Sequence, residues 1–327
     1  MGRILISVSA KPDVRERSTG LTDTAEKNRA MNVEIRDPRF TSVVGAEVQF
    51  DKIATGFRFT EGPLWHPKAD YLLFSDIPGD QLHRWSTTGG VSSFRKPSNM
   101  SNGLTYDHAG NVLACEHATS QVTRREHTGA IIPIATHYQG KQLNSPNDIV
   151  CARDGAIYFT DPPYGRVKFF GVRREQELPF QGIYRVGADP KNPSLLVDDF
   201  DRPNGLCFSL DGQRLFINDT ARQHIRIFAL DPKGILNGGK VWAETKGEGA
   251  GAPDGMKIDS AGNVYCCGPG GIHVFTPEAE CLGVIRVPEY TANMAWGDPD
   301  YCSLYIAAST SIYRIRVKVP GLPIYVK

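Results

Sequence analysis

From about residue 46 onward, short apolar runs alternate with breaks that contain Asp-Gly, Ala-Gly or proline. This pattern is typical of many short antiparallel strands, and it leaves little room for helices. In Ile225-Arg226-Ile227 apolar and polar positions alternate, as expected for a strand that buries one face. The pattern predicts an all-β protein.

The strand pattern recurs six times. Each copy starts with a small polar motif, continues into an apolar stretch and a turn, and ends in further strands. The motifs start at residues 61, 102, 147, 204, 254 and 293, at intervals of 41, 45, 57, 50 and 39 residues. This spacing suits a four-stranded propeller blade, whereas the repeats of a stacked solenoid are usually shorter and leave edge strands to cap. We therefore predict a six-bladed β-propeller over 46–320, with a loop at the charged insertion 166–181.

The two ends of the chain lack this repeat. Residues 1–45 are polar without a sustained period, so we expect an irregular or partly mobile N-terminal extension. Closure of the propeller is expected to join an early strand, 47–50, to the last blade, and 321–327 should form a C-terminal tail. The apolar run 4–8 is too short for a normal signal peptide, which favours a cytoplasmic protein, with a periplasmic or secreted one as the alternative.

Composition narrows the choice of partners. Lys and Arg number 37 against 36 Asp and Glu, so no basic excess supports nucleic-acid binding. No stretch approaches the roughly 20 apolar residues that span a bilayer. The seven cysteines form no Cys-x-x-Cys pair, and we expect all of them to be reduced and mostly buried. The predicted state is a monomer or a weak homo-oligomer that binds a small molecule.

The repeat register brings a set of polar side chains together. In a propeller the first strand of each blade lines the central channel, so equivalent motif positions converge on one ring around the axis. The residues at this position are Glu61, Asn102, Asn147, Asn204, Asp254 and Asn293. All six carry oxygen donors, which hard cations such as Ca²⁺ and Mg²⁺ prefer, and two carboxylates match one divalent charge. The sequence predicts a metal site on the axis.

Five ordered motifs now carry a resemblance to a known family. They are Glu61-Gly62-Pro63-Leu64-Trp65, Ser145-Pro146-Asn147-Asp148, 159–165 (FTDPPYG), 202–206 (RPNGL) and 253–256 (PDGM). Over about residues 50–317 the chain resembles the SMP-30/gluconolactonase family, and Cys115-Glu116-His117 is similar to its bacterial gluconolactonase branch. The resemblance implies a six-bladed propeller, lactone hydrolysis and an axial divalent ion, often calcium.

The same resemblance implies the ligands of that ion. They would be Glu61, Asn204 and Asp254, with Asn147 as a ligand or close neighbour. Ca²⁺ is the first expectation, and Mg²⁺, Mn²⁺, Zn²⁺ and Fe²⁺ are alternatives. This chain has Ser145 where family members hold an arginine that contacts sugar hydroxyls, so that contact is not carried over.

A mechanism follows from general chemistry. A metal can polarise the lactone carbonyl, and a nearby carboxylate can take a proton from the attacking water. We expect Asp254 to be this base and Glu61, its catalytic partner, to anchor the ion. Around the channel mouth, the candidates to hold the hydroxyl groups of a sugar lactone are Asn102, Glu116, His117, Asp148 and Tyr164.

Two other functional classes remain open at this point. One is a metal-dependent esterase or phosphotriesterase of the paraoxonase type, which would prefer apolar substrates. The other is a non-catalytic propeller that acts as an interaction scaffold, which would not need acidic ring positions. The chain has no Gly-x-Ser-x-Gly nucleophile motif and no phosphate-binding loop. The carboxylates Glu61 and Asp254 favour an enzyme.

Overall fold

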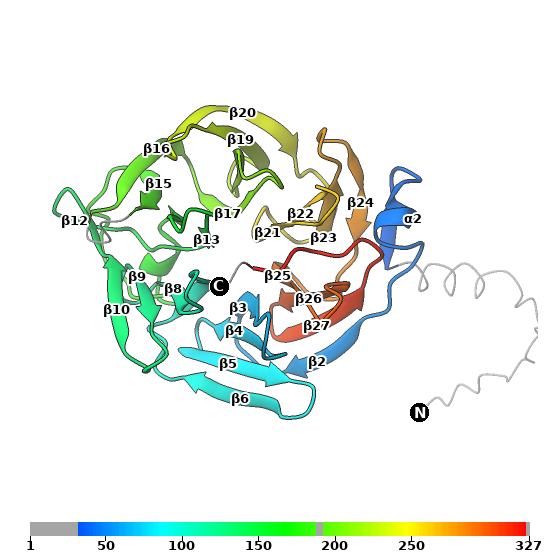
Figure 1. Cartoon of the computed structure of the whole chain (residues 1–327), viewed down its shortest axis with the longest axis horizontal. Coiled ribbons are helices and arrows are strands. Elements are labelled where there is room, and N and C mark those ends of the chain that lie inside the picture. Colours follow the sequence, from blue (N-terminus) through cyan, green and yellow to red (C-terminus); the bar gives the residue numbers. More distant parts are fainter. Residues whose placement is uncertain (1–31, 188–191, 325–327) are drawn as a thin grey trace, which may run out of the picture. The chain divides into compact units, whose positions relative to one another are not determined.

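The protein is a six-bladed β-propeller. The computed structural model describes residues 32–187 and 192–324. Six sheets of antiparallel strands surround a central axis (Figure 1). The six-bladed, almost entirely β architecture predicted from the repeats is confirmed.

Each blade contains four strands that run in order from the axis outward. The first three blades are β3 (Thr60–Trp65), β4 (Leu72–Asp76), β5 (Gln81–Ser86) and β6 (Gly90–Arg95); β7 (Ser101–Tyr106), β8 (Val112–Glu116), β9 (Gln121–Arg125) and β10 (Ile131–Ala135); and β13 (Ile149–Cys151), β14 (Ile157–Asp161), β15 (Gln181–Val186) and β16 (Ser194–Phe200). Blades 4 and 5 are β17 (Pro203–Phe208), β18 (Arg214–Asp219), β19 (His224–Leu230) and β20 (Leu236–Glu244); and β21 (Met256–Ile258), β22 (Val264–Gly268), β23 (Gly271–Phe275) and β24 (Cys281–Ile285). A small hairpin of β11 (His137–Tyr138) and β12 (Lys141–Gln142) joins blades 2 and 3.

Blade 6 combines the two ends of the propeller sequence. Its inner strands are β25 (Thr291–Gly297), β26 (Ser303–Ala308) and β27 (Ser311–Arg316), and its outer strand is β2 (Asp51–Thr55), which pairs with β27. Closure by an early strand is as expected, but the strand begins just after 47–50. In that segment Val48 is buried in the core between blades 5 and 6, and this burial accounts for its apolar character.

The expectation of an irregular segment up to residue 45 is wrong for its described part. Strand β1 (Val33–Ile35) pairs with β24 and adds a fifth strand to blade 5, and the short helix α2 (Phe40–Val43) follows it. Phe40 and Val33 are buried against blade 5, which explains why this short polar stretch is ordered without a repeat. The possible export signal lies outside the described residues.

Adjacent blades are held together by interleaved apolar side chains. Trp65 of blade 1 stacks on Tyr305 of blade 6 with ring centroids 5.1 Å apart, and Tyr265 of blade 5 meets Trp296 of blade 6 edge-on at 5.1 Å. All seven cysteines are unpaired, and four of them are buried within such contacts. They pack as small apolar residues, as predicted.

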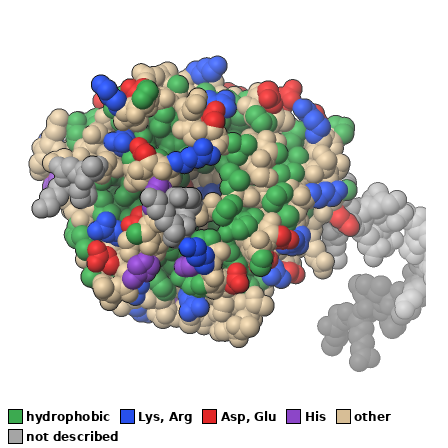
Figure 2. Space-filling view, in the orientation of Figure 1, with side chains coloured by type: hydrophobic (Ala, Val, Ile, Leu, Met, Phe, Trp, Pro, Cys, Tyr) green, Lys and Arg blue, Asp and Glu red, His purple; other side chains and the backbone are tan. Residues whose placement is uncertain are grey.

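Two further properties of the described residues are the length of their helices and the distribution of their charged side chains. No helix in the described part of the chain is long and apolar enough to cross a bilayer. On the face shown in Figure 2, acidic and basic side chains are interspersed and neither sign forms a continuous patch. On this face the mixed distribution matches the balanced count of acidic and basic residues.

Candidate active site

The six predicted ring residues lie at or just before the start of the inner strands, and all six are buried. In four blades the pairing of the first two strands is interrupted at this point: after Glu61, before and after Asn102, around Asn204, and before Asn293. Such bulges re-aim side chains from the plane of a sheet. The irregularity explains how positions on separate sheets present their polar groups to one axis.

Glycines after the ring residues set the spacing of the ring. A Cβ atom on Gly62 would lie 2.1 Å from the carbonyl oxygen of Asn102, and one on Gly205 would lie 2.2 Å from that of Asp254. A Cβ atom on Gly103 would lie 2.5 Å from the carbonyl oxygen of Asn147, and one on Gly255 would lie 2.1 Å from Oδ1 of Asn293. Each motif glycine therefore makes room for the ring residue of the neighbouring blade, which gives the recurrent Asn-Gly and Asp-Gly pairs a reason beyond turn formation.

The two ring carboxylates are buried close to each other. Burial raises the pKa of Glu61 to about 7, and the charge of Asp148 acts in the same direction. Burial also raises the pKa of Asp254 well above its usual range, with further contributions from Glu61 and Asp148. Neither Glu61 nor Asp254 forms an ion pair with any residue in the described ranges. A buried pair of acids without a cation in direct contact favours the binding of one.

The donors present fit a hard divalent ion. Nowhere in 32–187 or 192–324 do three His, Cys, Asp or Glu side chains form a metal-binding group. The predicted ligand set has a different composition, because carboxamides contribute half of it: Asn147 and Asn204 stand beside Glu61 and Asp254. Ca²⁺ and Mg²⁺ accept carboxamide oxygens readily, whereas zinc sites rely on Cys and His.

Asp148 adds a third carboxylate to this region. It is buried; one of its oxygens, Oδ1, accepts the backbone N–H of Ile149 at 2.9 Å, and Oδ2 has no hydrogen-bond partner. Burial raises the pKa of Asp148, while the charge of Lys257 opposes that rise. An unpartnered buried carboxylate oxygen is available to a ligand.

His117 and Asn102 form a pair at the channel mouth. The ring atom Nδ1 of His117 lies 2.9 Å from the carbonyl oxygen of Phe170, and Nε2 lies 3.3 Å from Nδ2 of Asn102. Since a carbonyl only accepts, Nδ1 carries the proton and Nε2 accepts from Asn102. Burial lowers the pKa of His117 to about 4, so the ring is neutral. The arrangement turns the carboxamide oxygen of Asn102 away from His117.

The insertion after blade 3's second strand covers this mouth. It begins with the 3₁₀ turn η1 (Tyr164–Arg166) and continues to β15 without a regular element. Phe170 meets Phe59 of blade 1 at 5.0 Å, and Arg174 donates to the carbonyl oxygens of His117 and Ala118 at 2.8 and 2.7 Å. The loop expectation is correct, and these contacts fasten the loop across blades 1 and 2.

Tyr164, at the start of this insertion, lies beside the ring. Its hydroxyl group is buried without a hydrogen-bond partner. Burial raises the pKa of Tyr164 to about 12, and the charge of Asp254 also raises it. Ser145 holds the start of the same insertion, since its hydroxyl donates to the carbonyl oxygen of Pro162 and accepts the N–H of Gly165 at 2.8 Å. In this chain, position 145 therefore fixes a loop.

Glu116 does not face the ring. Its carboxylate forms an ion pair with Arg95 at 2.8 Å and accepts hydrogen bonds from side chains of the same blade and its loops. Burial acts to raise the pKa of Glu116, but the hydrogen bond from Gln121 and the charge of Arg95 outweigh it and lower the pKa. Both of its oxygens are engaged, so the structure gives Glu116 a role in holding blade 2 to Arg95 of blade 1.

Two residues near the ring were not identified from the sequence. Tyr290 directly precedes the inner strand of blade 6, and the carboxylates of Asp254 and Glu61 contribute to raising the pKa of its buried hydroxyl, after burial itself. Lys257 follows Asp254 by three residues, and its Nζ donates to Oδ1 of Asn293 at 3.2 Å. The sequence did contain a signal for Lys257. It lies in the inner strand β21, where side chains alternate between two faces, so a residue three positions after Asp254 could have been placed near the axis.

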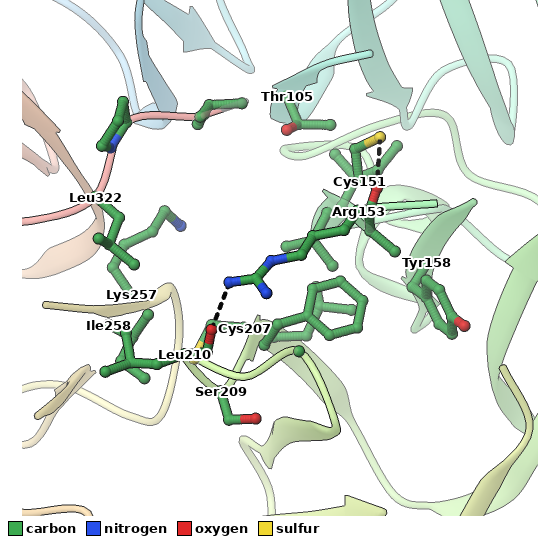
Figure 3. A pocket seen from close by; sticks show the side chains of 18 of the residues that line it. Thr105, Cys151, Arg153, Tyr158, Cys207, Ser209, Leu210, Lys257, Ile258 and Leu322 are labelled. Atoms are coloured by element: carbon green, nitrogen blue, oxygen red, sulfur yellow. Dashed lines mark hydrogen bonds between the residues drawn. The ribbon is translucent and has the colours of Figure 1, made fainter. Parts of the chain in front are cut away.

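A cavity of about 930 Å³ lies at the other end of the inner strands. Its walls include Trp65, Cys151, Phe208 and Ile258, and the C-terminal segment contributes Leu322 (Figure 3). Arg153 extends into it and donates to the carbonyl oxygen of Leu210 at 2.6 Å. No ring residue lines this space. The tail therefore contributes to a mostly apolar chamber that is separate from the polar ring.

Together these features define a class: a six-bladed propeller with a buried ring of oxygen donors at one end of its channel. The chain belongs to the SMP-30/gluconolactonase/LRE-like family, whose model matches residues 59–310.

Relatives of this family resemble the protein over most of its length. A gluconolactonase of Zymomonas mobilis subsp. mobilis is 32% identical over 87% of this chain and 85% of its own. The pentonolactonase XacC of Haloferax volcanii is 26% identical over 79% of this chain and 84% of its own. The solved structure of a gluconolactonase of Xanthomonas campestris superposes with a TM-score of 0.81 at 29% identity, covering 87% of this chain and 94% of that one.

Proposed function

We propose that this protein hydrolyses sugar lactones with the help of one divalent cation, Ca²⁺ in the first instance, held by Glu61, Asn147, Asn204 and Asp254. The observation that carries the proposal is the pair of buried ring carboxylates without an ion-pair partner. A scaffold has no use for such a pair, because burying two carboxylates without a direct ion-pair partner is costly. Relatives named as lactonases of six- and five-carbon sugar acids support the substrate class.

Asp254 is the proposed base. When bound, a divalent cation supplies a Lewis acid that polarises the lactone carbonyl. Asp254 takes a proton from the attacking water, whose oxygen bonds to the carbonyl carbon. The bond from this carbon to the ring oxygen breaks, the ring oxygen takes up a proton, and a hydroxy acid is released. A carboxylate in a buried site is a stronger base than one in water, which suits Asp254 to this task.

The other polar groups of the mouth orient the substrate. Asn102 donates its amide to neutral His117, so its carboxamide oxygen points away from the imidazole and can accept from a sugar hydroxyl. The free oxygen of Asp148 and the unpartnered hydroxyl of Tyr164 offer two further contacts. These groups favour a polyhydroxylated substrate over an aryl ester, because apolar substrates would leave them unsatisfied.

The test is metal removal. After treatment with a chelator, hydrolysis of glucono-1,5-lactone, corrected for spontaneous opening, should fall to background and return when a divalent ion is added. Ca²⁺, Mg²⁺, Mn²⁺, Zn²⁺ and Fe²⁺ would be compared, and aryl esters would be assayed in parallel. Full activity in the chelated protein would refute the metal-dependent mechanism, and a preference for aryl esters would favour the esterase alternative.

A further inference from the structure

Lys257 places a positive charge beside the ring of oxygen donors. It lies on β21, the inner strand of blade 5, and is partly buried. Its Nζ donates to Oδ1 of Asn293 at 3.2 Å and to the carbonyl oxygen of Met256 at 3.0 Å. Figure 3 shows its side chain beside the far-end cavity, which it also lines. The ammonium group thus stands between the ring and that cavity.

A chain of hydrogen bonds connects Lys257 to a proposed ligand. Asn293 receives the ammonium at Oδ1, and its Nδ2 donates to Oε2 of Glu61 at 3.0 Å. Oδ1 of Asn293 also accepts the backbone N–H of Met294 at 2.9 Å, which fixes the orientation of the carboxamide. A single ring residue therefore transmits the position of Lys257 to the carboxylate of Glu61.

The number of charges near the axis indicates why Lys257 lies beside Asn293. Glu61, Asp148 and Asp254 are three buried carboxylates that influence one another. A divalent ion neutralises two of them and leaves one uncompensated. Lys257 interacts electrostatically with both Glu61 and Asp148, so it supplies the remaining positive charge.

We propose that Lys257 is a positioning residue that balances the third axial carboxylate, so that the ring accepts one divalent ion with no net charge left over, and that it orients Glu61 through Asn293. This inference rests on the proposed metal site. It implies that Lys257 sets the charge preference of the site, because a fixed cation near the ring disfavours ions of higher charge.

Removing this charge should change which ions bind. In Lys257→Met, the affinity for Ca²⁺ should rise at least tenfold, and the affinity for the trivalent ion Tb³⁺ should rise by a larger factor. Lys257→Gln keeps a hydrogen-bond donor for Asn293 without the charge, so it should show the same shift. Lys257→Arg should bind both ions as the wild type does. Isothermal titration of the metal-free proteins with CaCl₂ and with TbCl₃ measures these affinities.

Lys240→Met is the matched control. It removes the same charge from β20, an outer strand, where Lys240 is exposed, and should leave both affinities unchanged. Circular dichroism melting confirms that each variant is folded, and Lys257→Gln serves if Lys257→Met is not. Unchanged or weaker binding of both ions in Lys257→Gln would overturn the role of Lys257 alone. If the wild type binds neither ion, the proposed metal site itself fails.

Discussion

Two sets of buried carboxylates lie one strand apart in this propeller, and they are stabilised in opposite ways. Glu61 and Asp254 stand on the axis. Asp76, Asp161 and Asp219 end the second strands of their blades, beside the starts of the inner strands. Both sets are buried, so burial alone does not distinguish a site from a scaffold.

The difference lies in the donors that surround each set. Asp219 accepts the backbone N–H groups of Asp201 and Arg202 at 2.9 and 3.1 Å, just before the ring residue of blade 4. Asp161 accepts those of Asn144 and Ser145, both at 2.8 Å, before the ring residue of blade 3. The outer acids are thus satisfied by the protein and hold the loops that lead to the ring. The axial acid Glu61 accepts the backbone N–H of Gly62 at 2.6 Å and Nδ2 of Asn293 at 3.0 Å, and both bonds go to its Oε2. Loops are not held by these bonds, so the axial pair is the one that suits a ligand.

The largest effect is expected at the axis. Asp254→Asn keeps shape and one oxygen donor but removes a charge and the proposed base, so lactone hydrolysis should fall by at least ~10²-fold. Its melting temperature should not fall, because the variant relieves repulsion with Glu61. Steady-state assays at saturating metal measure the loss of turnover.

Asp219→Asn is the matched control, with the opposite expected outcome. It should retain turnover but lose about 2 kcal/mol of unfolding free energy, since backbone N–H groups lose an acceptor. Near-normal turnover in Asp254→Asn would contradict the comparison.

The next effect concerns stability and is expected at Glu116, which belongs with the outer acids. Glu116→Gln should lower the unfolding free energy by about 2 kcal/mol at neutral pH, because Arg95 is left without its partner. The pKa of Glu116 is lowered in the folded protein from an ordinary 4.5, so its stabilisation is complete above that value and is lost as pH falls through the folded pKa. Urea unfolding from pH 7 to 3 should show the wild type and variant converging below about pH 4.5. A gap independent of pH would exclude this charge effect.

The smallest effect is expected at His117. His117→Leu removes the acceptor for Asn102, so the carboxamide is no longer held toward the substrate. One hydrogen bond contributes about 1 kcal/mol, which corresponds to roughly a fivefold rise in KM for glucono-1,5-lactone with kcat little changed. His117→Gln, which can still accept from Asn102, should recover most of the loss. A fall in kcat of the size expected for Asp254→Asn would place His117 in the chemical step instead.

The sequence predicted the ring because its members share a repeat position, and a closed propeller converts an equal register into spatial proximity. Glu116 shows where the inference from repeat position to spatial position fails. It adjoins His117 in the chain, yet it faces Arg95 on β6 while His117 faces Asn102. Neighbouring residues on extended backbone point in opposite directions, and only the pairing of the strand tells which of them faces the axis.

The positions of two segments outside the repeats could also not be predicted from the sequence. The insertion 166–181 carries no repeat, so its docking over blades 1 and 2 through Phe170 and Arg174 could not be inferred from a register. Strand β1 was missed because three residues with one buried side chain give no measurable period. In both segments the order comes from contacts with distant blades.

The glycines that follow the ring residues separate two properties of the site. Gly62 and Gly205 bring main chain against main chain between blades, so the diameter of the ring follows from the backbone. Its charge follows from side chains. In the proposed metal site, an exchange of Asn for Asp at a ring position would change the preferred ionic charge and leave the aperture alone, whereas an alanine at Gly205 would widen the aperture at constant charge. Ionic radius and ionic charge would then be two independently adjustable quantities of that site.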